Sequence, residues 1–117
     1  MERFFILTPT PTDRPDVYLD ASGNQMKWSG KFPIPAIGTK VFITMNGIGW
    51  ATVKGYFESY GYVGLMTLPA RPPKWLRDQH KRDAQDLGQP KWIREGIGCE
   101  FGAELALKKP TKPRLPK

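Results

Sequence analysis

Alternating apolar and polar side chains in the middle third of the chain form the clearest pattern in the sequence. Val41 and Ile43 alternate with polar or mixed positions, which is the two-residue period of a β-strand with one buried face. Asn46-Gly47 follows, a dipeptide that tolerates the positive φ angles of a type I′ turn. A second alternating run, Ile48 to Phe57, predicts the return strand. The pattern therefore predicts a β-hairpin that turns at Asn46-Gly47.

The return strand has two faces of different character. Alternation predicts that Ala51, Val53 and Phe57 point inward. A turn at Glu58 to Gly61 then leads to a third strand, Tyr62 to Leu68. The side chains expected on the outer face, with Tyr62 beside them across the strand pair, are Trp50, Thr52, Lys54 and Tyr56.

Two glycines, Gly55 and Gly64, fall inside these predicted strands. A glycine weakens a regular strand, but it suits a bulge or a sharp bend. Small barrels turn their corners in this way. The two positions therefore favour a tightly curved sheet.

Shorter runs predict the remaining strands. Arg3 to Thr8 reads as a first strand, and the segments 16–20 and 25–28 as a hairpin. The proline-rich stretch 8–15 predicts an extended loop, because proline cannot donate to a ladder. Ile97 to Leu107 alternates throughout and predicts a closing strand, which we expect to pair with the first strand.

One segment has the pattern of a helix. Pro72-Pro73 suits a helix start, and the residues from Trp75 to Leu87 favour a helix. Gly88 stands where a C′ glycine is expected. A thin apolar stripe runs along one side of this helix through Leu76, His80, Ala84 and Leu87.

The net charge of +7 is unevenly distributed over the 117 residues. Residues 1–70 carry six basic and five acidic side chains, whereas residues 71–94 carry seven and three. Residues 95–107 carry three acidic side chains and no basic one, and residues 108–117 carry five basic ones. The basic character therefore lies in the helical segment and in the C-terminal tail.

The composition argues against several classes of chemistry. The single cysteine, Cys99, excludes an internal disulfide, and His80 is the sole histidine. The chain therefore has too few cysteines and histidines to favour a zinc site or a Ser-His-Asp site. We expect no catalytic residue, no metal and no small-molecule cofactor. No run approaches the roughly 18 apolar residues of a membrane span, and the N-terminal apolar run is too short for a secretory signal. The expected location is cytoplasmic.

The segment Gly38 to Val53 resembles the SH3-like small-barrel module, particularly its KOW and Tudor-like forms. The shared features are an opening glycine, alternating apolar strand residues, a tight glycine turn and a further glycine in the next strand. In this chain they are Gly38, Val41, Ile43, Gly47, Gly49, Ala51 and Val53. The resemblance implies a binding module whose ligand is nucleic acid, a peptide or another protein.

Taken together, the patterns predict a mainly β protein, an SH3-like small barrel of five or six antiparallel strands. One helix is inserted near residues 73–87. Residues 1–107 form a single domain, and residues 108–117 form a flexible, basic, proline-rich tail.

The predicted function is that of a non-enzymatic accessory module, of phage or plasmid style, that binds nucleic acid or a nucleic-acid-associated protein. The alternative is a protein–protein interaction module, such as an inhibitor of a host enzyme. The same residues also have purely structural explanations. In these, the aromatic rings are buried under another element, and the basic side chains form a solvated face of the helix. The candidate binding residues are Trp50, Lys54, Tyr56, Tyr62, Arg71, Lys74, Arg77, Lys81, Lys91 and Arg94, with Lys108, Lys109, Lys112, Arg114 and Lys117 in the tail.

Overall fold

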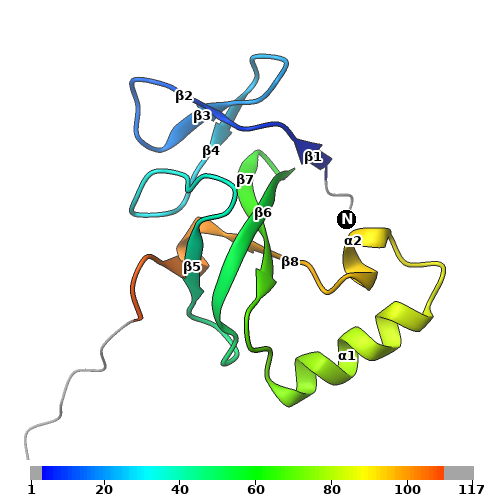
Figure 1. Cartoon of the computed structure of the whole chain (residues 1–117). Coiled ribbons are helices and arrows are strands. Elements are labelled where there is room, and N and C mark those ends of the chain that lie inside the picture. Colours follow the sequence, from blue (N-terminus) through cyan, green and yellow to red (C-terminus); the bar gives the residue numbers. More distant parts are fainter. Residues whose placement is uncertain (1–3, 110–117) are drawn as a thin grey trace, which may run out of the picture.

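The protein is mainly β, as predicted (Figure 1). The structure, a computed structural model, describes residues 4–109, the first three of them by their backbone alone. All strands of this part belong to one curled sheet. None of the helices in residues 4–109 is long and apolar enough to cross a membrane.

Three antiparallel strands form the middle of the sheet: β5 (Lys40–Ile43), β6 (Gly49–Ser59) and β7 (Tyr62–Pro69). The predicted turn between β5 and β6 is confirmed. Asn46 and Gly47 have φ angles of 56° and 70°, and the amide of Ile48 donates to the carbonyl of Met45. This is the geometry of a type I′ turn.

The C-terminal segment forms two short strands rather than one. β8 (Gly98–Phe101) pairs with β7, and β9 (Leu105–Ala106) pairs with β5. The 3-10 turn η1 (Gly102–Glu104) joins them and redirects the chain. The prediction that this segment pairs with the first strand is wrong, because β1 (Phe4–Ile6) pairs with β6 instead.

The N-terminal hairpin is confirmed. β3 (Val17–Leu19) and β4 (Gln25–Lys27) are antiparallel, and Lys27 joins β4 to β7 through one parallel pair with Tyr62. The predicted loop 8–15 is interrupted by a two-residue strand, β2 (Thr10–Pro11), beside β3. Proline is tolerated there because β2 has a strand on one side only.

A bulge in β6 reverses the predicted faces of its second half. The register with β7 shifts between Val53 and Gly55, and one extra residue turns every later side chain to the other face. Tyr56 consequently joins Ala51 and Val53 in the core, with 1% of its surface exposed. Its hydroxyl donates to the carbonyl of Pro35 at 2.6 Å. The prediction that Tyr56 faces outward is wrong.

The core lies inside the curled sheet and is closed by the N-terminal hairpin. Trp28 is buried there, and its indole Nε1 donates to the carbonyl of Phe32 at 2.6 Å. Phe57 faces away from Tyr56 and packs against Phe101, with ring centroids 5.2 Å apart. The buried side chains of the main cluster are Tyr18, Met26, Trp28, Val41, Ile43, Ala51, Val53, Tyr56, Val63, Leu65 and Leu105.

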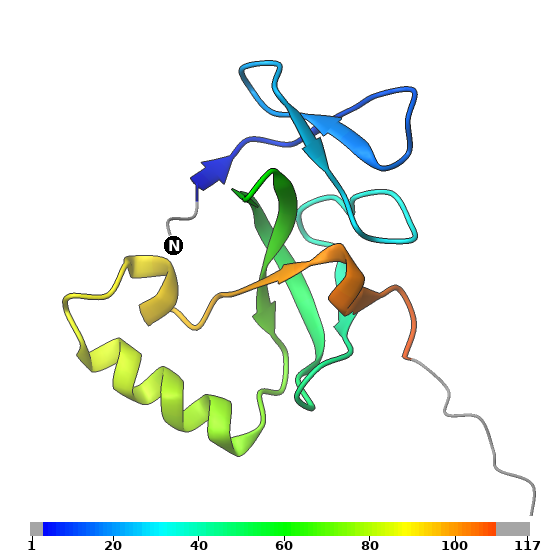
Figure 2. The ribbon, with the colours of Figure 1, turned by 180° about the vertical axis from the view of Figure 1, so that it is seen from behind.

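The helices α1 (Lys74–Gln85) and α2 (Lys91–Arg94) lie to one side of the sheet (Figures 1 and 2). None of the twelve residues of α1, all of which the structure describes, is buried. The predicted apolar stripe therefore faces no core, and Trp75 connects the helix to the β5–β6 turn by donating to the carbonyl of Asn46 at 3.3 Å. The helix ends before Gly88, which has no positive φ and is not its C′ residue.

The burial of Tyr56 predicts a loss of stability at alkaline pH. Burial raises the pKa of Tyr56 above its ordinary value of 10.0, and a backbone hydrogen bond with Ile37 opposes this in part. Because the folded protein holds this proton more tightly than the unfolded chain, the contribution is complete below pH 10 and is lost as the pH rises further. Urea unfolding at pH 9 and pH 11 should show this loss. It should be smaller in Tyr56→Phe, and equal losses in both proteins would contradict the prediction.

Candidate functional site

An open groove of about 680 Å³ lies on the outer face of the sheet, next to the β5–β6 turn. Its walls come from β5, β6 and the segment that follows β7. Most of the groove surface is apolar. The lining residues are Lys40, Ile48, Gly49, Trp50, Ala51, Thr52, Ala70 and Arg71.

Trp50 is the main aromatic side chain in this groove. It lies opposite Phe42 in the register of β5 and β6. The two rings meet edge to face, with centroids 5.4 Å apart and planes at 84°. Phe42 restrains the indole in this way, yet 38% of Trp50 stays exposed. A ring held in place and partly open to solvent is suited to stacking against a ligand.

Two cations line the same groove as the indole. Lys40 lies opposite Thr52 in the strand register, and Arg71 reaches the groove from the linker between β7 and α1. No carboxylate lines the groove among the described residues, and neither cation is in an ion pair with another described residue. The groove therefore combines an apolar floor with uncompensated positive charge.

The other residues predicted on the aromatic face do not join Trp50. Lys54 is exposed further along β6, outside the groove. Tyr56 is in the core. Tyr62 pairs with Ser59 at the far end of β6, and its ring lies 6.3 Å from that of Phe101. The four residues of the predicted face therefore lie in four different places in the fold.

The predicted basic patch is also divided, since only Arg71 reaches the groove. Lys74 pairs with Asp78 at 3.2 Å, and Lys91 lies 3.7 Å from Glu95. The exposed residues Arg77 and Lys81 remain on α1 as a second basic surface. The side chain of Arg94 donates through Nε to the carbonyl of Gln89 at 3.2 Å.

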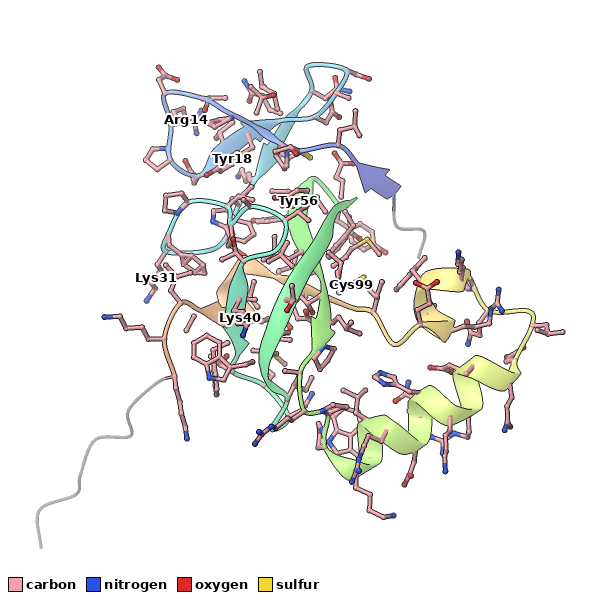
Figure 3. All side chains as sticks on the ribbon, in the orientation of Figure 1. Arg14, Tyr18, Lys31, Lys40, Tyr56 and Cys99 are labelled. Atoms are coloured by element: carbon pink, nitrogen blue, oxygen red, sulfur yellow. The ribbon has the colours of Figure 1, made fainter. Side chains whose placement is uncertain are left out.

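The two tail residues that the structure describes lie away from the groove at Trp50. Lys108 and Lys109 are exposed and, with Lys31, border a separate groove beside Leu107 (Lys31 is labelled in Figure 3). The other three tail residues, Lys112, Arg114 and Lys117, lie outside the described residues.

Sequence reasoning missed three residues that line the groove or support it, namely Lys40, Phe42 and Ile48. A signal for two of them was present, because alternation with Val41 and Ile43 already places Lys40 and Phe42 on the outer face. Pairing across the predicted turn would then have set Phe42 near Trp50. For Ile48, which precedes β6, the sequence carries no comparable signal.

The described residues contain no group of three or more His, Cys, Asp and Glu side chains that could hold a metal ion. Cys99 is half-buried on β8, and His80 lies against Gly96. The buried carboxylate of Glu100 accepts a hydrogen bond from the hydroxyl of Thr67. These groups come from separate places and do not converge on one site.

Comparison of the chain with protein-family models, with curated proteins and with solved structures finds no match. What the protein binds must therefore be inferred from its own residues. The groove around Trp50 is the place in the described part of the chain where a restrained ring, an apolar surface and unpaired cations occur together.

Proposed function

We propose that the sheet is a small barrel of the SH3-like kind. The strand pairings support this: they run from β9 through β5, β6 and β7 to β8, and η1 joins β8 to β9 directly. Each edge of the central three strands is thus paired, in part, by the same C-terminal segment. The bulge at Gly55 supplies the bend that such a closed sheet needs.

We propose that the protein is a non-enzymatic accessory module that binds single-stranded nucleic acid, alone or within a nucleoprotein complex. The observation that carries the proposal is the partly exposed indole of Trp50 in a groove that Lys40 and Arg71 also line. A base stacks on an aromatic ring without regard to sequence, and neighbouring cations hold the backbone phosphates. Arg77 and Lys81 on α1 add longer-range attraction for the same strand.

Trp50→Ala is expected to weaken binding of a poly-thymidine strand of about twenty nucleotides by about tenfold to a hundredfold, since stacking on one ring contributes about 1–3 kcal/mol. Fluorescence anisotropy of a labelled strand measures this. Trp75→Ala is the matched control, because Trp75 is similarly exposed but lies outside the groove. Equal losses in both variants would place the binding surface elsewhere.

Salt dependence tests the role of the cations. If Lys40 and Arg71 contact phosphates, changing either one to glutamine should reduce the slope of log K against log salt by about 1. The double variant Lys74→Glu with Lys81→Glu should weaken binding further, because it reverses two of the charges by which α1 attracts the strand. If the affinity of the unmodified protein for the strand does not change with salt concentration, the electrostatic part of the proposal is contradicted.

A protein partner is the second candidate function, and the mainly apolar surface of the groove favours it. A central tryptophan with apolar neighbours is typical of the energetic centre of a protein interface. In that case one discrete partner, such as an enzyme that the module inhibits, should bind with little dependence on salt. Trp50→Ala should then abolish that complex, whereas the poly-thymidine strand should not compete with it.

A further inference from the structure

Tyr60 is held in a backbone conformation that rarely suits tyrosine. Ser59 pairs with Tyr62, so Tyr60 and Gly61 form a two-residue loop between β6 and β7. Their φ angles are 53° and 78°. Asparagine, aspartate and glycine occupy this first loop position readily, whereas a bulky side chain there is an outlier.

The other hairpin of this sheet shows the usual solution. At its turn, Asn46 adopts a φ angle of 56° and Gly47 one of 70°. The same chain therefore uses Asn-Gly at one end of β6 and Tyr-Gly at the other. Packing does not explain the tyrosine, because 82% of Tyr60 is exposed. A strained residue whose side chain points into solvent suggests that the ring has a binding role.

Cationic and amide side chains line the same hollow as Tyr60. A hollow of about 390 Å³ lies between the β6–β7 turn and the N-terminal hairpin. Arg14 reaches it from the loop before β3 (Figure 3), and Gln25 and Lys27 reach it from β4. Among the described residues, no carboxylate lines this hollow. Its positive charge therefore suits an anionic ligand that has a flat face.

The hollow is separate from the groove at Trp50. β6 runs from Trp50 at one end to the Tyr60 turn just beyond the other. Ten residues of strand at about 3.3 Å each correspond to about 30 Å. A nucleic-acid strand of several nucleotides would therefore be needed to contact both places.

We propose that Tyr60, Arg14, Lys27 and Gln25 form a second nucleotide subsite. A base stacks on the Tyr60 ring, the guanidinium and ammonium groups hold a phosphate, and the Gln25 amide meets the base edge. The inference rests on the proposed function, because it assigns to the same single-stranded ligand a second point of contact. Binding at two linked points raises affinity for long strands more than for short ones.

Tyr60→Asn is the decisive variant, because it removes the ring and relieves the backbone together. We expect the melting temperature to rise by about 3 °C, while affinity for a poly-thymidine strand of about twenty nucleotides falls about tenfold. A strand of four nucleotides should lose much less, since it cannot span both subsites. Loss of affinity with a raised melting temperature cannot be attributed to unfolding.

The outcomes separate this inference from the proposed function. If Tyr60→Asn binds the long strand as tightly as the unmodified protein while Trp50→Ala does not, the second subsite is wrong and the first stands. If poly-glutamate competes with the strand for Trp50→Ala as effectively as unlabelled poly-thymidine does, the hollow binds acidic protein segments and the inference is overturned. If the unmodified protein binds no strand of either length, both proposals fail.

Discussion

Gly64→Ala is expected to destabilise the protein by about 3 kcal/mol, near the upper end of what overpacking usually causes. A Cβ atom at Gly64 would lie 2.3 Å from two carbons of the Phe57 ring and 2.7 Å from the carbonyl oxygen of Glu100. The ring is buried and the carbonyl belongs to the neighbouring strand β8, so neither can move cheaply. The clash would force β7 and β8 apart.

Gly55→Ala is the matched control for this change. A Cβ atom there meets only the sulfur of Met66 at 3.9 Å, which is ordinary contact, and Gly55 has no positive φ. Alanine should be neutral or stabilise the protein by up to about 1 kcal/mol, because it restricts the unfolded chain. Urea unfolding compares the two variants. Equal stability of Gly64→Ala and the unmodified protein would show that β7 and β8 are less closely packed than described.

Tyr56→Ala is expected to destabilise the protein by about 4 kcal/mol, as for other large aromatic side chains removed from a core. The ring is buried beside Ala51 and Val53. Its hydroxyl also satisfies the carbonyl of Pro35, which ties the 32–37 segment to the sheet. Trp50→Ala, only six residues away on the same strand, should cost less than about 1 kcal/mol, since the indole is partly exposed.

The comparison of these two aromatic residues is a sharp test of the bulge. Tyr56→Phe keeps the ring and loses only the hydrogen bond, so it should cost about 1 kcal/mol. Binding of a nucleic-acid strand to Tyr56→Phe should be unchanged, because the hydroxyl lies in the core. The reverse result, a stable Tyr56→Ala with impaired binding, would mean that β6 alternates without interruption and that Tyr56 is part of the outer face.

Much of the fold could be predicted from local sequence. Asn46-Gly47 has few alternatives to a tight turn, and the alternation on either side of it specifies which residues of β5 are buried. The N-terminal hairpin follows from similar signals. A glycine inside a strand predicts a bulge or a sharp bend at Gly55, and the register shift lies beside it. Its effect on Tyr56 requires knowing at which residue of which strand the extra position lies.

The arrangement of the chain ends could not be predicted, because it depends on contacts between distant residues. Regular alternation from Ile97 to Leu107 gives no sign of the turn at Gly102. A Cβ atom at Gly102 would lie 2.3 Å from the backbone nitrogen of Gly30, so the chain at this turn packs against a segment distant in sequence. The helix poses the opposite problem: its pattern predicts α1 well, yet no pattern reveals that its apolar side meets no core.

The candidate site was predicted only in part for the same reason. Trp50 and Arg71 were both identified, but as members of two different surfaces, and they come together through the end of β7. The aromatic face is predicted from strand alternation, and the basic patch from the segment 71–94, so neither prediction connects Trp50 with Arg71. Local sequence places Tyr60 in a turn. The conformational cost of a tyrosine at that position becomes visible only with the positive φ angle that the hairpin imposes.

The order of the strands along the chain has a consequence for synthesis on the ribosome. The hairpin of β5, β6 and β7 is complete by residue 69, but β8 and β9, which cover its edges, follow about thirty residues later. In the interval the nascent hairpin exposes backbone amides and carbonyls that can pair with another chain. The charged helix α1 emerges during this interval, and we expect its charges to oppose such pairing until β8 and β9 are made.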